Sequence, residues 1–218
     1  MAFDHNDHYH RLILRHLPGG CRTALDVGCG TGGFARGLAD RGISVDAVDP
    51  AAEVIEAARA RSEHRGGGPG PRYRRADITR TELPRGHYDF ISCLASIHHM
   101  PFGTVAALRD ALAPGGVLVI LGCYREVSPV DRAWSLAAVP ANAVARLTVR
   151  AAETVRSAGG SGAHGPERAR SVRAPVRQPA MSLAEIRRET SGLLPGATLR
   201  RLLFWRYLLV FRKSDSSR

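Results

Sequence analysis

An acidic residue near the start of the chain, Asp26, is followed by three glycines at alternating positions, Gly28, Gly30 and Gly32. The short apolar stretch around Asp26 predicts a buried strand, and the residues from Thr31 onward predict a helix. The glycines therefore occupy a strand-to-helix turn, where the lack of side chains lets a ligand approach the backbone. We expect backbone N–H groups of this turn to bind a polar or anionic group, either a phosphate or a carboxylate.

Two kinds of ligand suit such a turn. Gly28, Gly30 and Gly33 also satisfy the dinucleotide pattern G-x-G-x-x-G, and Asp49 follows at roughly the 20-residue spacing that this pattern requires. Asp26 favours the other kind, because a carboxylate at the end of the strand repels a pyrophosphate but accepts hydrogen bonds from an ammonium group. The turn is therefore predicted to hold the amino-acid part of a ligand.

The D-x-G-x-G-x-G run at 26–32 resembles motif I of the class I S-adenosylmethionine (SAM) dependent methyltransferases. A second landmark of that family is the L-A-P-G-G-V-L-V-I run at 112–120, which predicts a tight turn and a central strand. The resemblance covers residues 9–121 and returns at 182–213. It implies an α/β, Rossmann-like fold with a seven-stranded, mostly parallel sheet, helices on both faces and a C-terminal antiparallel hairpin.

The elements that position these motifs follow from apolar spacing and turn signals. Strands are predicted around Leu25 and at Ile43–Val48, Tyr73–Ala76, Tyr88–Cys93, Val117–Leu121, Ala197–Phe204 and Trp205–Arg212. Helices are predicted at Asp4–Leu17, Gly32–Arg41, Ala51–Arg61, Phe102–Leu112 and from a capping box at Ser182 and Glu185 through Leu194. We also expect a helical, lid-like insertion with a mobile loop at about 127–180, the alternatives being a pair of packing helices or a helix at a membrane surface.

The resemblance implies roles for acidic residues that follow successive strands. Asp26 would face the ammonium of SAM, Asp49 its ribose hydroxyls and Asp77 its adenine, with Ile78 against the ring. Asp49 and Asp77 fit the capping of a helix start or a turn equally well, and both interpretations stay open. The further cofactor-binding candidates are the rest of the turn, its neighbours and the first helix: Gly28, Cys29, Gly30, Thr31, Gly32, Pro50, Leu94, Tyr9 and His10.

Two adjacent histidines, His98 and His99, follow the strand predicted at Tyr88–Cys93. Ligands bind outside the carboxyl ends of strands in open parallel sheets, so this segment is expected to face the transferred methyl group. An imidazole suits the removal of a proton from a hydroxyl or amine. The S-I-H-H-M run resembles the same turn in small-molecule methyltransferases of natural-product pathways, where one histidine can act as a base. We prefer His99 over His98 for this role, and a purely structural histidine is the alternative.

The composition indicates one domain spanning 1–218, because 218 residues with 44% hydrophobic content suffice for one α/β core and are few for two. The four cysteines form no C-x-x-C pair, so neither a disulfide framework nor a metal site is predicted. No apolar run of about 18 residues and no signal-peptide pattern occurs. We therefore expect a cytoplasmic protein without stable membrane insertion.

The net charge of +11 is concentrated in the last third of the chain. Up to Ala141 there are 16 basic and 15 acidic residues, and after it 15 basic and 5 acidic ones. Such a distribution fits an acidic or carrier-tethered substrate, a membrane surface or nucleic acid, and equally the arginine-rich composition of a GC-rich genome.

The resemblance implies methyl transfer from SAM by in-line displacement, with S-adenosylhomocysteine (SAH) as the product. No N/D-P-P-Y run follows the fourth predicted strand, and no Pro-Cys nucleophile is present, so the usual signatures of nucleobase methylation are missing. A small-molecule acceptor is predicted, with O-methylation favoured over N-methylation and nucleic acid not expected as a partner. The alternatives are a nucleic-acid or protein methyltransferase that uses the basic C-terminal region, and a SAM-binding protein without transfer activity. The oligomeric state is left open.

Overall fold

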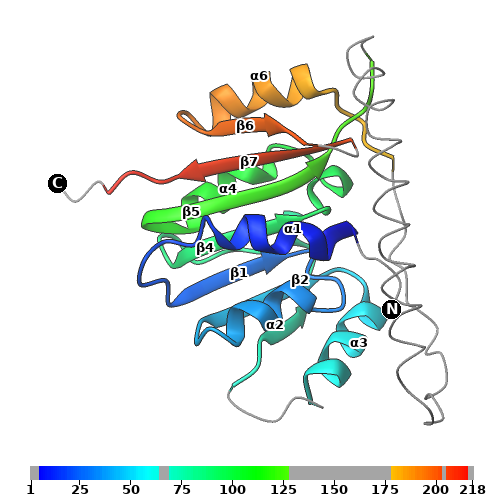
Figure 1. The fold of residues 1–218 in the computed structure, drawn as a ribbon, viewed down its shortest axis with the longest axis vertical. Helices are drawn as coiled ribbons and strands as arrows, with labels where there is room; N and C mark the ends of the chain where they lie inside the picture. Colours follow the sequence, from blue (N-terminus) through cyan, green and yellow to red (C-terminus); the bar gives the residue numbers. More distant parts are fainter. Residues whose placement is uncertain (1–4, 64–68, 128–177, 203–204, 216–218) are drawn as a thin grey trace, which may run out of the picture.

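A computed structural model describes residues 5–63, 69–127, 178–202 and 205–215. In these residues seven strands form one sheet in the order β3-β2-β1-β4-β5-β7-β6 (Figure 1). The strands are β1 (Thr23–Val27), β2 (Ser44–Asp49), β3 (Arg72–Arg75), β4 (Tyr88–Leu94), β5 (Leu112–Cys123), β6 (Thr198–Arg201) and β7 (Arg206–Arg212). The insertion predicted at about 127–180 falls almost wholly outside the described residues.

The first five strands pair in parallel, and β7 is antiparallel to both β5 and β6. The predicted mostly parallel, Rossmann-like sheet with a closing hairpin is therefore confirmed. The connections between parallel strands place helices on both faces of the sheet. A central strand must therefore be apolar on both of its faces. In β5, every residue from Val117 to Leu121 is at most 1% exposed.

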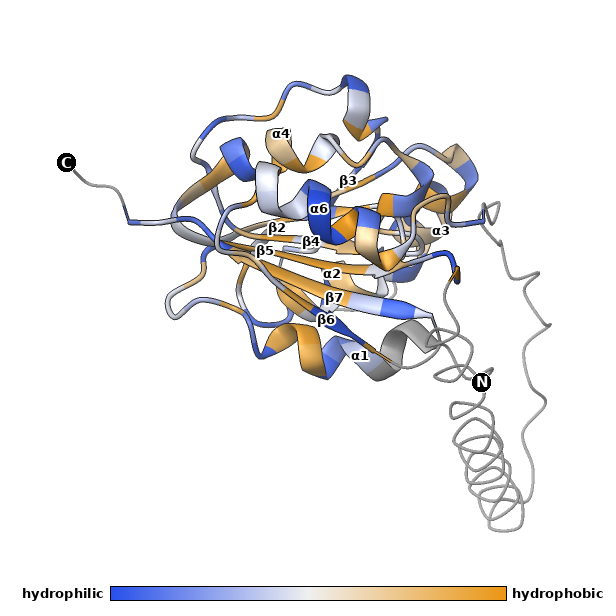
Figure 2. Cartoon of the chain, turned by 90° about the horizontal axis from the view of Figure 1, so that it is seen from above, coloured by the Kyte–Doolittle hydropathy of each residue, from blue (hydrophilic) through white to orange (hydrophobic). Residues whose placement is uncertain are grey.

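Helices cover both faces of the sheet. The helices are α1 (His5–Leu14), α2 (Gly33–Ala39), α3 (Ala52–Glu63), α4 (Thr104–Ala111) and α6 (Leu183–Leu193), with short 3-10 turns η1 (Ile78–Arg80) and η2 (Ile97–His99). Figure 2 shows α4 and α6 on one side of the sheet and α1 on the other. No helix within the described residues is both long and apolar enough to cross a bilayer.

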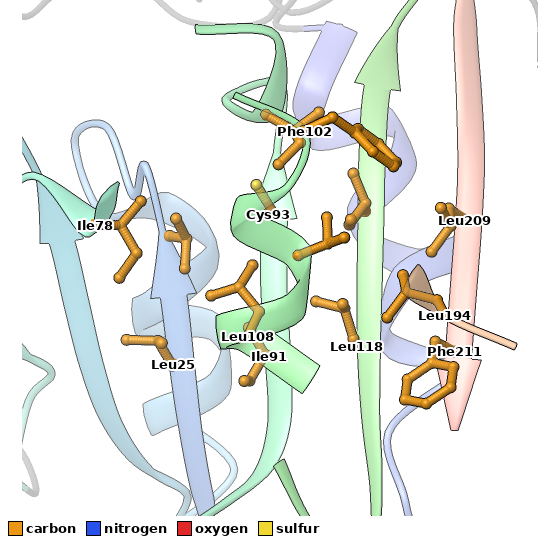
Figure 3. Packing of buried hydrophobic residues seen from close by; sticks show 14 of the residues in the cluster. Leu25, Ile78, Ile91, Cys93, Phe102, Leu108, Leu118, Leu194, Leu209 and Phe211 are labelled. Carbon is orange, nitrogen blue, oxygen red and sulfur yellow. The ribbon is translucent and has the colours of Figure 1, made fainter. Parts of the chain in front are cut away.

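The core consists of two apolar layers, one on each face of the sheet. The layer under α4 and α6 includes Leu25, Ile91 and Leu118 from three neighbouring strands (Figure 3). The layer under α1, α2 and α3 includes Ile13, Phe34 and further residues of the same strands. Alternate residues of each strand thus enter opposite layers, which follows from the period of two in a β-strand.

Strand β5 begins at Leu112, five residues before its predicted start, and α4 ends at Ala111. Tyr88 pairs with Leu112, whereas Phe90 pairs with Val117, so the run at 113–116 bulges out of the ladder. Backbone hydrogen bonds between this bulge and Lys213 hold it against the end of β7. The turn signal in the P-G-G run was correct, but the turn is a bulge within a strand rather than a connection before it.

Both edge strands are rich in arginine. β3 has the sequence R-Y-R-R and pairs only with β2, and β6 has the sequence T-L-R-R and pairs only with β7. Tyr73 of β3 is buried, while the three arginines of that strand are exposed.

The capping box predicted at the start of α6 is present. The Ser182 hydroxyl accepts a hydrogen bond from the Glu185 N–H at 3.3 Å, and the Glu185 carboxylate accepts one from the Ser182 N–H at 2.7 Å. Ser182 is 6% exposed. If its hydroxyl is removed, the Glu185 N–H at the helix start therefore loses its acceptor and has little access to water in its place.

We expect Ser182→Ala to lower the free energy of unfolding by about 1 kcal/mol, the usual contribution of a serine cap. Urea unfolding measures it. Ser191→Ala is the control, because the exposed Ser191 hydroxyl donates only to the Arg188 carbonyl within the same helix. An equal effect of the two substitutions would contradict the role of the cap.

Candidate active site

The carboxyl ends of β1, β2, β4 and β5 lie along one edge of the sheet, and the start of antiparallel β7 joins them there (Figure 1). The strand order runs outward in opposite directions from β1 and β4, which makes the gap between them the switch point of the topology. Ligands of open α/β sheets bind at such a switch point. Of the predicted site residues, Asp26 lies at the end of β1, and His98 lies in the turn η2 after β4.

The glycine turn after β1 folds back over the end of β2. The N–H groups of Gly28 and Cys29 both donate to the Val48 carbonyl, at 2.8 and 3.0 Å. The Gly30 N–H donates to the Asp49 carboxylate at 3.1 Å, and the Gly32 N–H donates to the Cys29 carbonyl. The expectation that the turn offers its backbone N–H groups to a ligand is therefore wrong for these four groups, because the protein itself binds them.

The glycines differ in what surrounds them. Gly28 has φ +67°, and a Cβ there would overlap the side chain of Ser96. Gly32 has φ +76°, and a Cβ there would overlap the Tyr73 ring. Gly30 has φ +54°, and a Cβ there would meet no described atom within 4 Å. The first and third glycines thus serve packing, and Gly30 is where a ligand can approach the backbone.

Ser96, which the sequence did not single out, fixes the two sides of the switch point together. Its hydroxyl donates to the Val27 carbonyl at the end of β1, at 2.7 Å, and lies 3.0 Å from the Cys93 sulfur. The preceding Ala95 has φ +54°, which is unusual for a residue with a side chain. In the sequence, the only sign of this contact is the glycine at position 28, which leaves room for the Ser96 side chain.

Asp26 is buried, with 2% of its surface exposed. The Ser92 hydroxyl of neighbouring β4 donates to its carboxyl group at 2.7 Å. Burial raises the pKa of Asp26 to about 7, although the Ser92 hydrogen bond opposes this and Asp49 adds a small increase. A buried carboxyl group of this kind is suited to pair with a cationic group and to lose its proton when it does.

Asp49 connects the glycine turn to the start of α3. One carboxylate oxygen accepts from the Gly30 N–H, and the other accepts from the Ala51 N–H at 3.0 Å, directly before α3. Its role at the helix start is confirmed, while ribose binding stays a prediction. The adjacent Pro50 carbonyl accepts from the Arg75 side chain at 3.3 Å.

Asp77 is exposed and caps the short turn η1. It accepts from both the N–H and the hydroxyl of Thr79, at 2.9 and 2.7 Å, and these hydrogen bonds lower the pKa of its carboxyl group. Ile78 is 6% exposed and joins the core beside Val48. The capping interpretation of Asp77 is thus confirmed, and the contact of either residue with adenine stays a prediction.

The remaining cofactor candidates lie around the turn. Tyr9 is 8% exposed, and the Arg206 guanidinium lies 6.0 Å from its ring centroid. The His10 ring packs on Phe34 at 5.0 Å between centroids, and Leu94 is half-buried at the end of β4. Cys29 is buried, and burial raises the pKa of its thiol.

The two histidines have different surroundings. Their rings lie 4.1 Å apart between centroids, but His99 is exposed and His98 is half-buried. Within the described residues, the buried Nδ1 of His98 has no hydrogen-bond partner. Burial, with smaller contributions from His99 and Arg206, lowers the pKa of His98 to about 4, so the ring is neutral at pH 7.

His98 lines a cavity of about 50 Å³ at the ends of β5 and β7. The other lining residues are mostly apolar: Ile97, Met100, Phe102, Cys123, Pro179, Ala180, Met181, Ile186 and Tyr207. Arg206 starts β7 opposite Cys123 in the ladder, and among described residues its buried Nη1 has no hydrogen-bond partner. Arg206 is a second site candidate that the sequence did not single out, because one arginine among many carries no local signal.

The strand order, the closing hairpin, the open approach at Gly30 and the buried carboxyl group of Asp26 define a class I SAM-dependent methyltransferase. Asp26 fits the ammonium of SAM by charge, and the Gly30 backbone leaves space for its amino-acid part. The dinucleotide alternative loses its support, because the turn's N–H groups are bound by Val48, Asp49 and Cys29 rather than directed at a pyrophosphate.

Comparison with known proteins agrees. A family model described as a methyltransferase domain matches residues 25–120. The uncharacterized methyltransferase Mb0092 of Mycobacterium bovis is 32% identical over 211 residues, which is 95% of this chain and 95% of that protein. The chain therefore belongs to the class I SAM-dependent methyltransferase family, and its methyl donor is SAM.

Two further similarities concern part of the chain and the fold. The ubiquinone biosynthesis O-methyltransferase of Xanthomonas euvesicatoria pv. vesicatoria is 34% identical over 125 residues, which cover 56% of this chain and half of that enzyme. The crystal structure of the PH0226 protein of Pyrococcus horikoshii OT3 matches with a TM-score of 0.60 and 18% identity, over 95% of this chain and 89% of that one. The second match supports the fold alone.

We expect Gly28→Ala to destabilise the protein by about 3 kcal/mol, from the left-handed backbone and the overlap with Ser96 together. Gly42→Ala is the matched control, because Gly42 has φ +79° but open space around a Cβ. Urea unfolding should show a smaller loss for Gly42→Ala. The double variant Gly28→Ala, Ser96→Gly should lose less stability than the sum of its two single substitutions, because the overlap is absent when Ser96 has no side chain. Equal losses at the two glycines would contradict a tight contact with Ser96.

We expect Asp26→Asn to flatten the pH dependence of stability in the ligand-free protein. The pKa of Asp26 is raised from 3.8 to about 7 on folding, so its contribution is complete below about pH 4 and is lost as the pH rises through 7. The difference in unfolding free energy between variant and wild type should change by up to about 1.4 kcal/mol per pH unit in that window. An unchanged pH dependence in Asp26→Asn would contradict a raised pKa of Asp26 in the folded protein.

Proposed function

We propose that this protein methylates a hydroxyl oxygen of a small-molecule acceptor, with His98 as the base that takes the hydroxyl proton. The observation that carries the proposal is the position of His98, whose neutral ring lines an apolar cavity at the end of β5 and the start of β7. Its buried Nδ1 has no hydrogen-bond partner among the described residues, and the acceptor hydroxyl would supply one. The sequence favoured His99 for this role, whereas the position of His98 at the cavity supports His98 instead.

The methyl donor would be held on the other side of β4. Asp26 would pair with its ammonium, the turn from Gly28 to Gly32 would contact its amino-acid part, and Asp49 and Asp77 would bind ribose and adenine. When bound, SAM supplies an electrophilic methyl group on a sulfonium and leaves as SAH. The chain's own task is then to hold the acceptor oxygen in line, to exclude water and to take one proton.

Oxygen as the attacking atom is supported by the ubiquinone biosynthesis O-methyltransferases among the relatives and by a neutral imidazole, which matches the need to remove a hydroxyl proton. The same proposal treats residues 1–218 as one methyltransferase domain, supported by the joining of all seven described strands in one sheet. A cytoplasmic location and a part in natural-product biosynthesis stay predictions from the sequence.

A transfer assay tests the proposal. The protein is incubated with methyl-labelled SAM and a panel of phenols, alkyl amines and short RNAs, and label in each acceptor is counted. We expect label in phenols only. Transfer to amines or RNA alone would contradict the assignment, and a steep loss of RNA labelling with salt would identify phosphate contacts in that case. Calorimetry that shows binding of NAD and no binding of SAM would contradict SAM as the methyl donor.

We expect His98→Ala to lower turnover on an accepted phenol by about 10² or more, because the proton acceptor is removed. Affinity for SAH should change little, since His98 lies on the acceptor side of β4. His98→Asn is the second variant, which keeps a polar side chain in the cavity. His99→Ala is the control and should keep most of the turnover. Equal turnover of the His98 variants and wild type would contradict the assignment.

A further inference from the structure

We propose that Arg206 binds a carboxylate on the methyl acceptor, so that the preferred acceptor is a hydroxy-aromatic acid. This inference rests on the proposed function, because it specifies the substrate of the same site. It uses three observations: a buried donor with no partner among the described residues, its pairing with Cys123 at the sheet edge, and the apolar cavity that Cys123 and His98 both line.

Arg206 carries a charged, half-buried guanidinium. Its Nη1 is buried, and within the described residues it makes no hydrogen bond and no ion pair. A buried donor on a charged group is costly to leave unpaired, which is why such groups normally face a carboxylate or a carbonyl. An arginine fork matches the two oxygens of a carboxylate, so a ligand carboxylate would satisfy it.

Arg206 lies among groups at the start of β7. It pairs with Cys123 in the ladder, and its guanidinium lies 6.0 Å from the Tyr9 ring centroid. Burial lowers the pKa of His98, and the charge of Arg206 adds to this lowering. No carboxylate contributes to the pKa shift of His98, so the described surroundings of that ring are electropositive. A bound acceptor carboxylate would neutralise Arg206 and make His98 more basic when the acceptor is in place.

The order along the sheet edge separates this arginine from the methyl donor. Asp26 lies at the end of β1, His98 follows β4, and Arg206 starts β7 two strands further on. Three strand spacings correspond to about 14 Å between the backbones of Asp26 and Arg206. The arginine is thus on the far side of the base from the donor's ammonium site, where an acceptor extends.

The lining of the cavity defines the rest of the acceptor. Ile97, Met100 and Phe102 line it with apolar side chains, and the described lining residues with polar side-chain atoms are His98, Cys123 and Tyr207. An apolar ring fits such a lining better than a sugar or an aliphatic polyol. At about 50 Å³ the cavity is smaller than typical ligand sites, so its side chains must move apart when a ring enters.

Calorimetry on the SAH-loaded protein tests the inference, with 3,4-dihydroxybenzoate and its neutral analogue 3,4-dihydroxybenzamide as probes. We expect the acid to bind wild type at least about tenfold more tightly than the amide, and Arg206→Gln to abolish this preference. Arg212→Gln is the matched control, because Arg212 is at the opposite end of β7, where it donates to the Gly115 carbonyl. Unchanged SAH affinity shows that each variant is folded.

Several outcomes would overturn the inference: no binding of the acid to wild type, equal affinity for acid and amide, or a preference that survives in Arg206→Gln. A tenfold loss of affinity for SAM but not for decarboxylated SAM in that variant would also overturn it, because the arginine would then serve the donor's carboxylate. If Arg206→Gln removes the acid preference while no phenol is methylated, the carboxylate site stands and the proposed function fails.

Discussion

The contact between Gly28 and Ser96 is the constraint on which the geometry of the site depends. It joins the turn after β1 to the turn after β4, the two strands that flank the switch point of the sheet. The Ser96 hydroxyl satisfies the Val27 carbonyl, and the missing side chain at Gly28 lets the two backbones come close. One packing contact therefore sets the position of the segment that carries His98 relative to the glycine turn.

Charge changes sign along the edge of the sheet. Carboxyl groups lie at the ends of β1 and β2 and just after β3, whereas a histidine follows β4 and an arginine starts β7. A cationic donor and an anionic acceptor would each meet the opposite charge at its own end, so both would be drawn to the site in one orientation. The cavity that His98 lines is mostly apolar, so electrostatic interactions there are screened less than in water.

The sequence predicted the elements and their order well, because apolar periodicity, glycine turns and the capping box at Ser182 are local signals. It did not predict which donors of the glycine turn are used internally, since that depends on the Val48 carbonyl of another strand. The preference for His99 could not be tested by spacing, because neighbours differ in burial only after the chain folds. Arg206 differs from the other arginines only in the structure, where its buried Nη1 has no hydrogen-bond partner among the described residues.

The arginines of the edge strands bear on the behaviour of the whole molecule. β3 and β6 leave backbone groups open along the two sides of the sheet, and such edges can template association with another sheet. Each edge presents several positive charges, including Arg72 and Arg74 on β3 and Arg200 on β6. A second copy that approaches edge to edge would bring like charges together. Part of the net charge of +11 thus acts as protection against aggregation, and salt weakens this protection by screening.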